Sequence, residues 1–112
     1  MSNTVLKFVL VVRVPQTYTT EQAQKVAPEW DQTIAYWKAQ GAYVESFPFP
    51  RPGYVLSGPE RRTEEGAITW GEQQVVSIVT LQAANIAQAT ELAKRCPILD
   101  HGGTVEVRER MS

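Results

Sequence analysis

The residues best suited to acid–base chemistry lie near the C-terminal end of this 112-residue chain. His101 is the only histidine, and it directly follows Asp100. A carboxylate that orients an imidazole can make it a general base near neutral pH. The alternative is a structural turn, because neighbouring side chains point in different directions and an aspartate before Gly-Gly is common in turns. We rank Asp100 and His101 first among the candidate catalytic residues.

A second group of residues could form a pocket for a flat organic ligand, because aromatic side chains give such pockets their walls. Arg13 could hold a carboxylate or enolate of that ligand, although an interface salt bridge explains it equally well. Trp30 shares a helical stripe with Trp37, so a place in the core is the alternative for both. The candidate ligand-binding residues are Arg13, Trp30, Phe47, Phe49, Tyr54 and Trp70.

The N-terminal third of the chain predicts a strand followed by a helix. Residues 4–14 alternate, with a core face of Leu6, Phe8, Leu10, Val12 and Val14 opposite a mixed face that includes Arg13. Thr19 and Gln22 form a capping-box pattern for the helix. Pro28 predicts either a kink or a fresh start, and Gly41 predicts the stop. The expected apolar stripe is Val26, Trp30, Ile34 and Trp37.

The middle of the chain predicts two firm strands around an irregular region. Residues 42–48 and 74–82 are the strands, and the FPRPG segment between them is expected to be a loop or an edge crossing. In the second strand, Val75, Ser77, Val79 and Leu81 are expected opposite Val76, Ile78 and Thr80. A hairpin formed by 54–57 and 67–70 would enclose the polar segment ERRTEEG.

The last third predicts a helix, a turn and a closing strand. Asn85 is the expected N-cap, with Ile86, Ala89, Ala93 and Cys96 facing inward. Pro97 ends the helix at or before Cys96. Gly102 and Gly103 can take positive φ, and the alternation of residues 104–110 is that of a half-buried strand.

This C-terminal stretch, AKRCPILDHGGTVEVR, resembles the end of the YCII-related family, also called the DGPF-domain family. The segment WDQTIAYWKAQG at 30–41 also resembles that family's first helix. The resemblance implies one YCII-related domain over residues 1–112, with a ferredoxin-like α+β fold that pairs into a dimeric α/β barrel. The predicted element order, β-α-β-β-α-β, is independently typical of that fold and leaves one sheet face bare, which favours a homodimer.

The sequence departs from this family at its two most characteristic sites. Ungapped counting brings residues 65–68, Glu-Gly-Ala-Ile, to the Asp-Gly-Pro-Phe motif, and it brings Trp30 to the histidine that some members carry in the first helix. The resemblance therefore leaves Asp31 and Glu65 as stand-ins for the missing acid–base groups, ranked second and third. We expect them to converge with Arg13 and the aromatic residues on the mixed sheet face.

Composition and charge exclude several classes of partner. Eleven Lys and Arg against 12 Asp and Glu give no field that would attract nucleic acid or an anionic membrane. The single Cys96 and the absence of a signal-peptide pattern favour the cytoplasm. One His and one Cys make no metal-ligand set, and no nucleotide-binding fingerprint is present, so we expect neither metal nor cofactor.

Two functions of different classes remain open at this point. One is an enzyme that acts without a cofactor on a small aromatic or polyketide-like molecule, as a lyase, isomerase or cyclase that transfers protons. Barrels of this superfamily host such reactions, which is an argument from analogy. The other is a non-catalytic dimeric binding or accessory protein, which the two departures from the family pattern favour.

Overall fold

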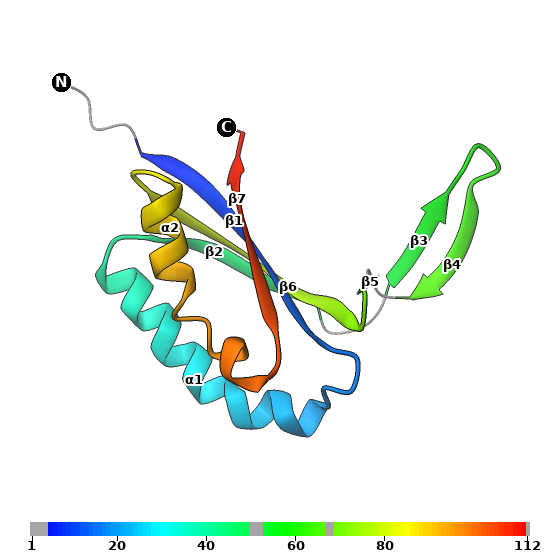
Figure 1. Cartoon of the computed structure of the whole chain (residues 1–112), viewed down its shortest axis with the longest axis horizontal. Helices are drawn as coiled ribbons and strands as arrows, with labels where there is room; N and C mark the ends of the chain where they lie inside the picture. Colours follow the sequence, from blue (N-terminus) through cyan, green and yellow to red (C-terminus); the bar gives the residue numbers. More distant parts are fainter. Residues whose placement is uncertain (1–4, 50–52, 67–68, 112) are drawn as a thin grey trace.

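The computed structural model describes residues 5–49, 53–66 and 69–111. Its elements follow the chain in an order that Figure 1 labels. They are β1 (Leu6–Pro15), α1 (Thr20–Ala39), β2 (Tyr43–Pro48), β3 (Gly53–Ser57), β4 (Arg62–Gly66), β5 (Thr69–Trp70), β6 (Gln73–Ala83), α2 (Ile86–Ala93), the 3-10 helix η1 (Pro97–His101) and β7 (Thr104–Arg110).

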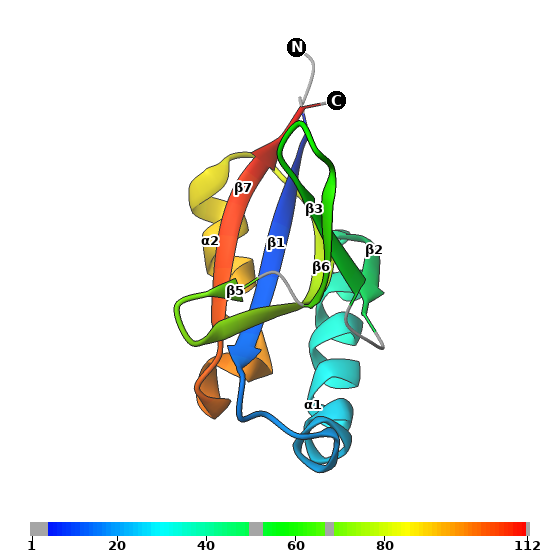
Figure 2. The same ribbon diagram turned by 90° about the vertical axis from the view of Figure 1, so that its right-hand side faces the viewer.

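The main sheet is antiparallel, with the strand order β2-β6-β1-β7 and the short β5 added beside β6. Both helices lie on one face of this sheet (Figures 1 and 2). The predicted α+β, ferredoxin-like β-α-β-β-α-β arrangement is therefore confirmed. We call the face away from the helices the open face.

The core lies between the helices and the sheet, and the alternation of β1 determines which side chains enter it. Phe8, Leu10, Val12 and Val14 are each 0% exposed, as expected from the period-two pattern. The predicted face assignment of β6 is wrong at one end. A bulge in β6 places Ser77 opposite Val12 and Val75 opposite Arg13. Val75 therefore lies on the same face of the sheet as Arg13. The extra residue, Val76, packs against the core.

The two helices differ greatly in length, although both begin at the predicted caps. Thr19 and Gln22 form the capping box of α1, and the Asn85 side chain accepts a hydrogen bond from the Gln88 N–H in α2. Helix α1 has 20 residues and α2 has eight, which correspond to roughly 30 Å and 12 Å. Of the two alternatives predicted at Pro28, the structure shows the kink. Helix α1 is continuous through Pro28, and its first part runs at an angle to the rest (Figure 1).

The two glycines of the C-terminal turn are needed for different reasons. Helix α2 ends at Ala93, and Pro97 opens η1. Gly102 has φ of 81°, whereas Gly103 is needed because a Cβ there would lie 2.5 Å from Ile98 Cγ1 and 2.6 Å from the Arg13 carbonyl oxygen. Ile86 was expected to face inward, but it lies in the first turn of α2 and stays 49% exposed.

The hairpin in the middle of the chain has a different second strand from the one expected. Strand β3 pairs with β4, which lies inside the predicted polar turn, and 69–70 pair with β6 instead. Every residue of β3 and most of β4 are exposed, so a polar sequence can form this ribbon without burying charge. Residues 67–68 of the predicted second strand, and 50–52 of the predicted loop, lie outside the described residues.

Candidate functional site

A cavity of about 870 Å³ lies between the sheet and the part of α1 from Thr20 to Ile34. It exists because α2 is short and covers only part of the layer in which α1 lies. Its floor is formed by β1 and β6, and its rim by the end of β2 and the base of the β3–β4 hairpin. Floor and rim residues include Val12, Val14, Ser46, Pro48, Gly53, Gly66, Ser77 and Val79.

Four of the residues predicted from the sequence line this cavity: Trp30, Asp31, Phe49 and Tyr54. Trp30 and Asp31 come from α1, while Phe49 and Tyr54 flank the segment that joins β2 to β3. Phe49 is 47% and Tyr54 67% exposed, so the aromatic wall is still accessible from outside. The combination of aromatic surface and one carboxylate is typical of a site for a small organic ligand.

The far end of the same layer is closed by hydrogen bonds between α1 and the end of α2. Trp37 is 0% exposed and donates its Nε1–H to the Leu92 carbonyl oxygen at 3.0 Å. The Thr33 hydroxyl donates to the Arg95 carbonyl oxygen at the same distance. The ring centroids of Trp30 and Trp37 lie 6.4 Å apart, so the wall of the cavity packs directly against the core.

His101 has a carboxylate partner, but it is Glu29 on α1, not the adjacent Asp100. The His101 Nε2 atom lies 3.3 Å from Glu29 Oε2, and both side chains are partly exposed. Tyr18 lines the cavity, and burial, assisted by the negative charge of Glu29, raises the pKa of its hydroxyl. Glu29 and Tyr18 were missed by the sequence reasoning, because 72 positions separate Glu29 from His101 and no spacing motif joins them.

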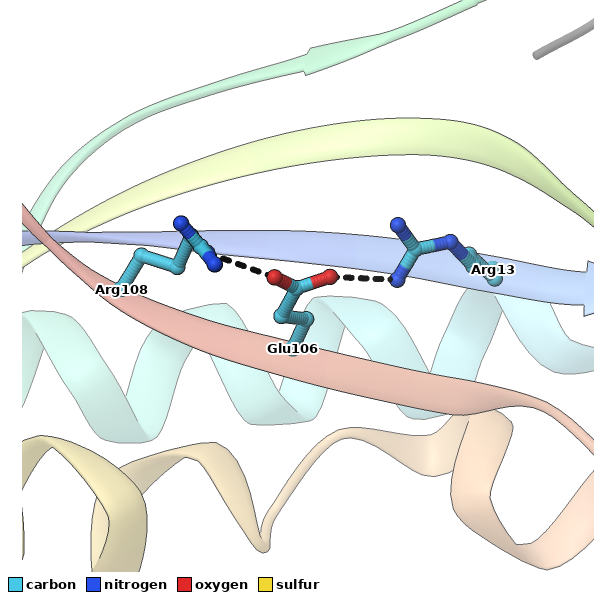
Figure 3. A network of polar contacts seen from close by, with 3 residues as sticks. All are labelled: Arg13, Glu106 and Arg108. Atoms are coloured by element: carbon cyan, nitrogen blue, oxygen red, sulfur yellow. Dashed lines mark hydrogen bonds and ion pairs between the residues drawn. The ribbon is translucent and has the colours of Figure 1, made fainter. Parts of the chain in front are cut away.

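Arg13 lies on the open face, so the expected convergence of Arg13 with the aromatic residues is wrong. Successive residues of β1 point to opposite faces, and Val12 and Val14 are the ones that reach the cavity. Arg13 Nη1 donates to Glu106 Oε1 at 2.9 Å, and Arg108 Nε donates to Glu106 Oε2 at 2.6 Å (Figure 3). These two hydrogen bonds, from Arg108 first and then Arg13, hold the pKa of the Glu106 carboxyl below its ordinary value.

Three other predicted residues are not among the described residues that line the cavity. Phe47 pairs with Ile78, Glu65 pairs with Tyr54 in the exposed hairpin, and Asp100 is exposed on η1. The backbone of Trp70 belongs to β5 and pairs with Gln73, while its side chain lies outside what the structure describes.

Cys96 is 2% exposed, and burial raises the pKa of its thiol to about 12, so it is not an activated nucleophile. Across residues 5–49, 53–66 and 69–111, no three His, Cys, Asp or Glu side chains gather as a metal site, and no helix is long and apolar enough to cross a membrane.

No family model and no curated protein matches this chain. One solved structure that it resembles is 5-chloro-2-hydroxyhydroquinone dehydrochlorinase (TftG) from Burkholderia phenoliruptrix AC1100, in complex with 2,5-dihydroxybenzoquinone. The identity is 14% and the TM-score 0.48, over 94% of this chain and 93% of the other. A likeness this weak assigns neither an activity nor a ligand to the present chain.

Proposed function

We propose that this protein binds a small, flat organic molecule in the cavity between α1 and the sheet. The observation that carries the proposal is the gathering of Trp30, Asp31, Phe49 and Tyr54 around one cavity from two separate parts of the chain. A volume of about 870 Å³ accommodates a molecule of one to three rings. The aromatic side chains would stack on the ligand, and the Asp31 carboxylate would accept a hydrogen bond from its hydroxyl group.

The reaction we infer for this site is proton transfer without a cofactor, as in an isomerase, lyase or cyclase. Asp31 is the residue placed to take a proton, because it is the one carboxylate among the described lining residues. Tyr18, which is protonated at neutral pH like an ordinary tyrosine, would donate a hydrogen bond to a developing oxyanion. The resemblance of the C-terminal stretch to the YCII-related family supports this reading by analogy.

The second candidate is a non-catalytic binding protein with the same ligand. The observation that favours it is the placement of the first-ranked pair, since His101 contacts Glu29 and neither His101 nor Asp100 is among the lining residues. Trp30 also occupies the place at which the resemblance would put a histidine. Binding without turnover of a hydroxylated aromatic ligand would distinguish this candidate from the enzyme.

We further propose a homodimer formed through the open face. The half-buried apolar side chains there include Val9, Val11 and Ile78, and no helix of the described chain covers this face. Val11 lies opposite Ile78 in the register of β1 and β6. Such a face in a small α+β domain is commonly covered by a second copy. The family resemblance implies the same pairing.

The direct test is a set of hydroxylated aromatic fragments, titrated by calorimetry against the parent protein and an Asp31→Asn variant. The carboxylate contributes a charge-assisted hydrogen bond, so Asp31→Asn should weaken binding by about tenfold. The matched control is Glu21→Gln, an exposed carboxylate on the first turn of the same helix, and it should leave binding unchanged. Equal affinities for all three proteins would contradict the assignment of Asp31.

A further inference from the structure

The β3–β4 hairpin is a feature that neither the core nor the cavity explains in full. It projects on the open-face side of the sheet, away from the helices (Figures 1 and 2). Tyr54, Val55 and Leu56 are 67%, 42% and 62% exposed, although they form three consecutive positions of a strand. An isolated two-stranded hairpin is at best marginally stable in water, so this one requires a surface to rest on.

The open face carries a cluster of positive charge where the first residues of β1 pair with the last residues of β7. In the register of β1 and β7, Lys7 lies opposite Arg110 and Val9 opposite Arg108. Like charges directly opposite one another on two strands are destabilising. Among the residues that the structure describes, neither Lys7 nor Arg110 has an ion-pair partner. The cluster therefore favours a negatively charged partner.

The hairpin carries charges of both signs, and they are divided between its two faces. Tyr54 and Leu56 of β3 share one face with Glu65 of β4, whereas Glu64 and Arg62 lie on the other. The Arg62 Nε lies 3.7 Å from the Glu64 Oε1, while Glu65 has no ion-pair partner among the residues that the structure describes. One face of the hairpin is therefore apolar and acidic, and the hairpin lies on the same side of the molecule as the cationic sheet face.

We propose that the hairpin of one chain packs on the open face of a second copy, with Leu56 against the valines of β1 and with Glu65 beside Lys7 and Arg110 of that copy. The occupant is a second copy because each chain carries both complementary surfaces on one side, so that one two-fold rotation satisfies both at once. This inference rests on the proposed dimer, and it adds the segment that holds the dimer together.

The contact also bears on the cavity, because the base of the hairpin is part of its rim. Gly53, Tyr54, Val55 and Gly66 all line the cavity. A hairpin held by a second copy therefore fixes the aromatic wall, whereas a free hairpin leaves it movable. Dimer formation and ligand affinity are then coupled, so a variant that weakens the dimer also weakens ligand binding.

The first experiment compares dimer dissociation constants by sedimentation equilibrium for the parent chain, Leu56→Asp and Ile86→Asp. Ile86 is a matched control, since it is a large apolar side chain that is 49% exposed on α2, on the other side of the sheet. Leu56→Asp should weaken the dimer by about tenfold or more, because it places a charge in an apolar contact. Ile86→Asp should leave the dissociation constant within about twofold.

The second experiment reverses charges in two separate chains. Glu65→Lys, and Lys7→Glu with Arg110→Glu, should each weaken self-association, whereas an equimolar mixture of the two variants should form a heterodimer with the affinity restored. The paired changes Glu21→Lys and Lys25→Glu on α1 are the control and should have no effect. A parent dimer that all these variants leave intact would overturn the hairpin contact but not the dimer. A monomeric parent would overturn both.

Discussion

Two tryptophans of α1, seven residues apart, have opposite environments. Trp37 is 0% exposed and hydrogen-bonded to the end of α2, whereas Trp30 is half-buried and lines the cavity. Both belong to one apolar stripe, because seven residues are close to two turns of a helix. The difference comes from the neighbouring helix. Where α2 lies beside α1 the layer closes, and where α2 is absent it remains open as a cavity.

One end of this layer is closed by structural contacts, and the other is the end at which we propose that a ligand binds. At the closed end, the polar atoms of Trp37 and Thr33 are used to join α1 to the end of α2. At the open end, the Asp31 carboxylate and the aromatic wall are available to a ligand. Substitutions at the closed end should therefore reduce stability, and those at the open end should reduce binding.

The largest effect is expected from Trp37→Ala, which should lower the free energy of unfolding by about 3–5 kcal/mol, because it leaves a cavity in a close-packed core and removes the hydrogen bond to the Leu92 carbonyl. Trp30→Ala should cost only about 1 kcal/mol, since its side chain already borders a cavity. Urea denaturation of the two variants measures both values. Equal losses would show that the two ends do not differ.

A smaller loss, about 1–2 kcal/mol, is expected for Thr33→Val. The Thr33 hydroxyl is buried and donates to the Arg95 carbonyl oxygen, which loses its partner when the hydroxyl is replaced by a methyl group. Thr20→Val, on an exposed threonine at the cavity end of the same helix, is the matched control and should change stability by less than about 0.5 kcal/mol. Chemical denaturation at neutral pH provides the comparison.

Much of this arrangement was predictable from local signals in the sequence. The caps at Thr19 and Asn85 and the alternation of β1 depend on neighbouring residues, and each appears where expected. The bulge at Val76 depends on cross-strand register, which the sequence of one strand does not contain. The second strand of the hairpin was missed because its polar residues have the composition of a turn.

The candidate site was predictable in part for the same reason. Aromatic residues and Asp31 could be selected by type, but the choice between cavity wall and core required the length of α2. The partnership of His101 with Glu29 joins η1 to α1 through the fold. Arg13 was assigned to the ligand because a charge on a strand suggests a role, and only the register with β7 identifies Glu106 as its partner.

A pH-dependent effect is expected at the closed end from Cys96. Burial raises the pKa of its thiol to about 12, so the unfolded chain loses this proton first as pH rises. The stability is therefore constant below the ordinary thiol pKa and falls above it, by about 1.4 kcal/mol one unit above that pKa. Urea unfolding of the parent and Cys96→Ala at pH 7 and at about pH 9.5 should isolate this loss in the parent. The same decline in both proteins would assign it to other groups.

The smallest effect is expected on the open face, from Glu106→Gln. The pKa of Glu106 is lowered by its hydrogen bonds to Arg108 and Arg13, so its stabilising contribution is present above the ordinary carboxyl pKa and is lost as pH falls through the lowered value. The variant should melt slightly below the parent at pH 7, and the two melting temperatures should converge in acid. A difference that persists unchanged at acid pH would contradict the ion-pair explanation.

The central proposal is that a ligand binds on the helix side of the sheet. The direct measurement is a map of amide chemical-shift changes by NMR as a hydroxylated aromatic fragment is added. Binding in the cavity should change the amide chemical shifts of Val12, Ala23, Asp31 and Ser77, all of which border the cavity. Changes confined to Val9, Ile78 and Arg108 on the open face, with the cavity residues unmoved, would contradict it.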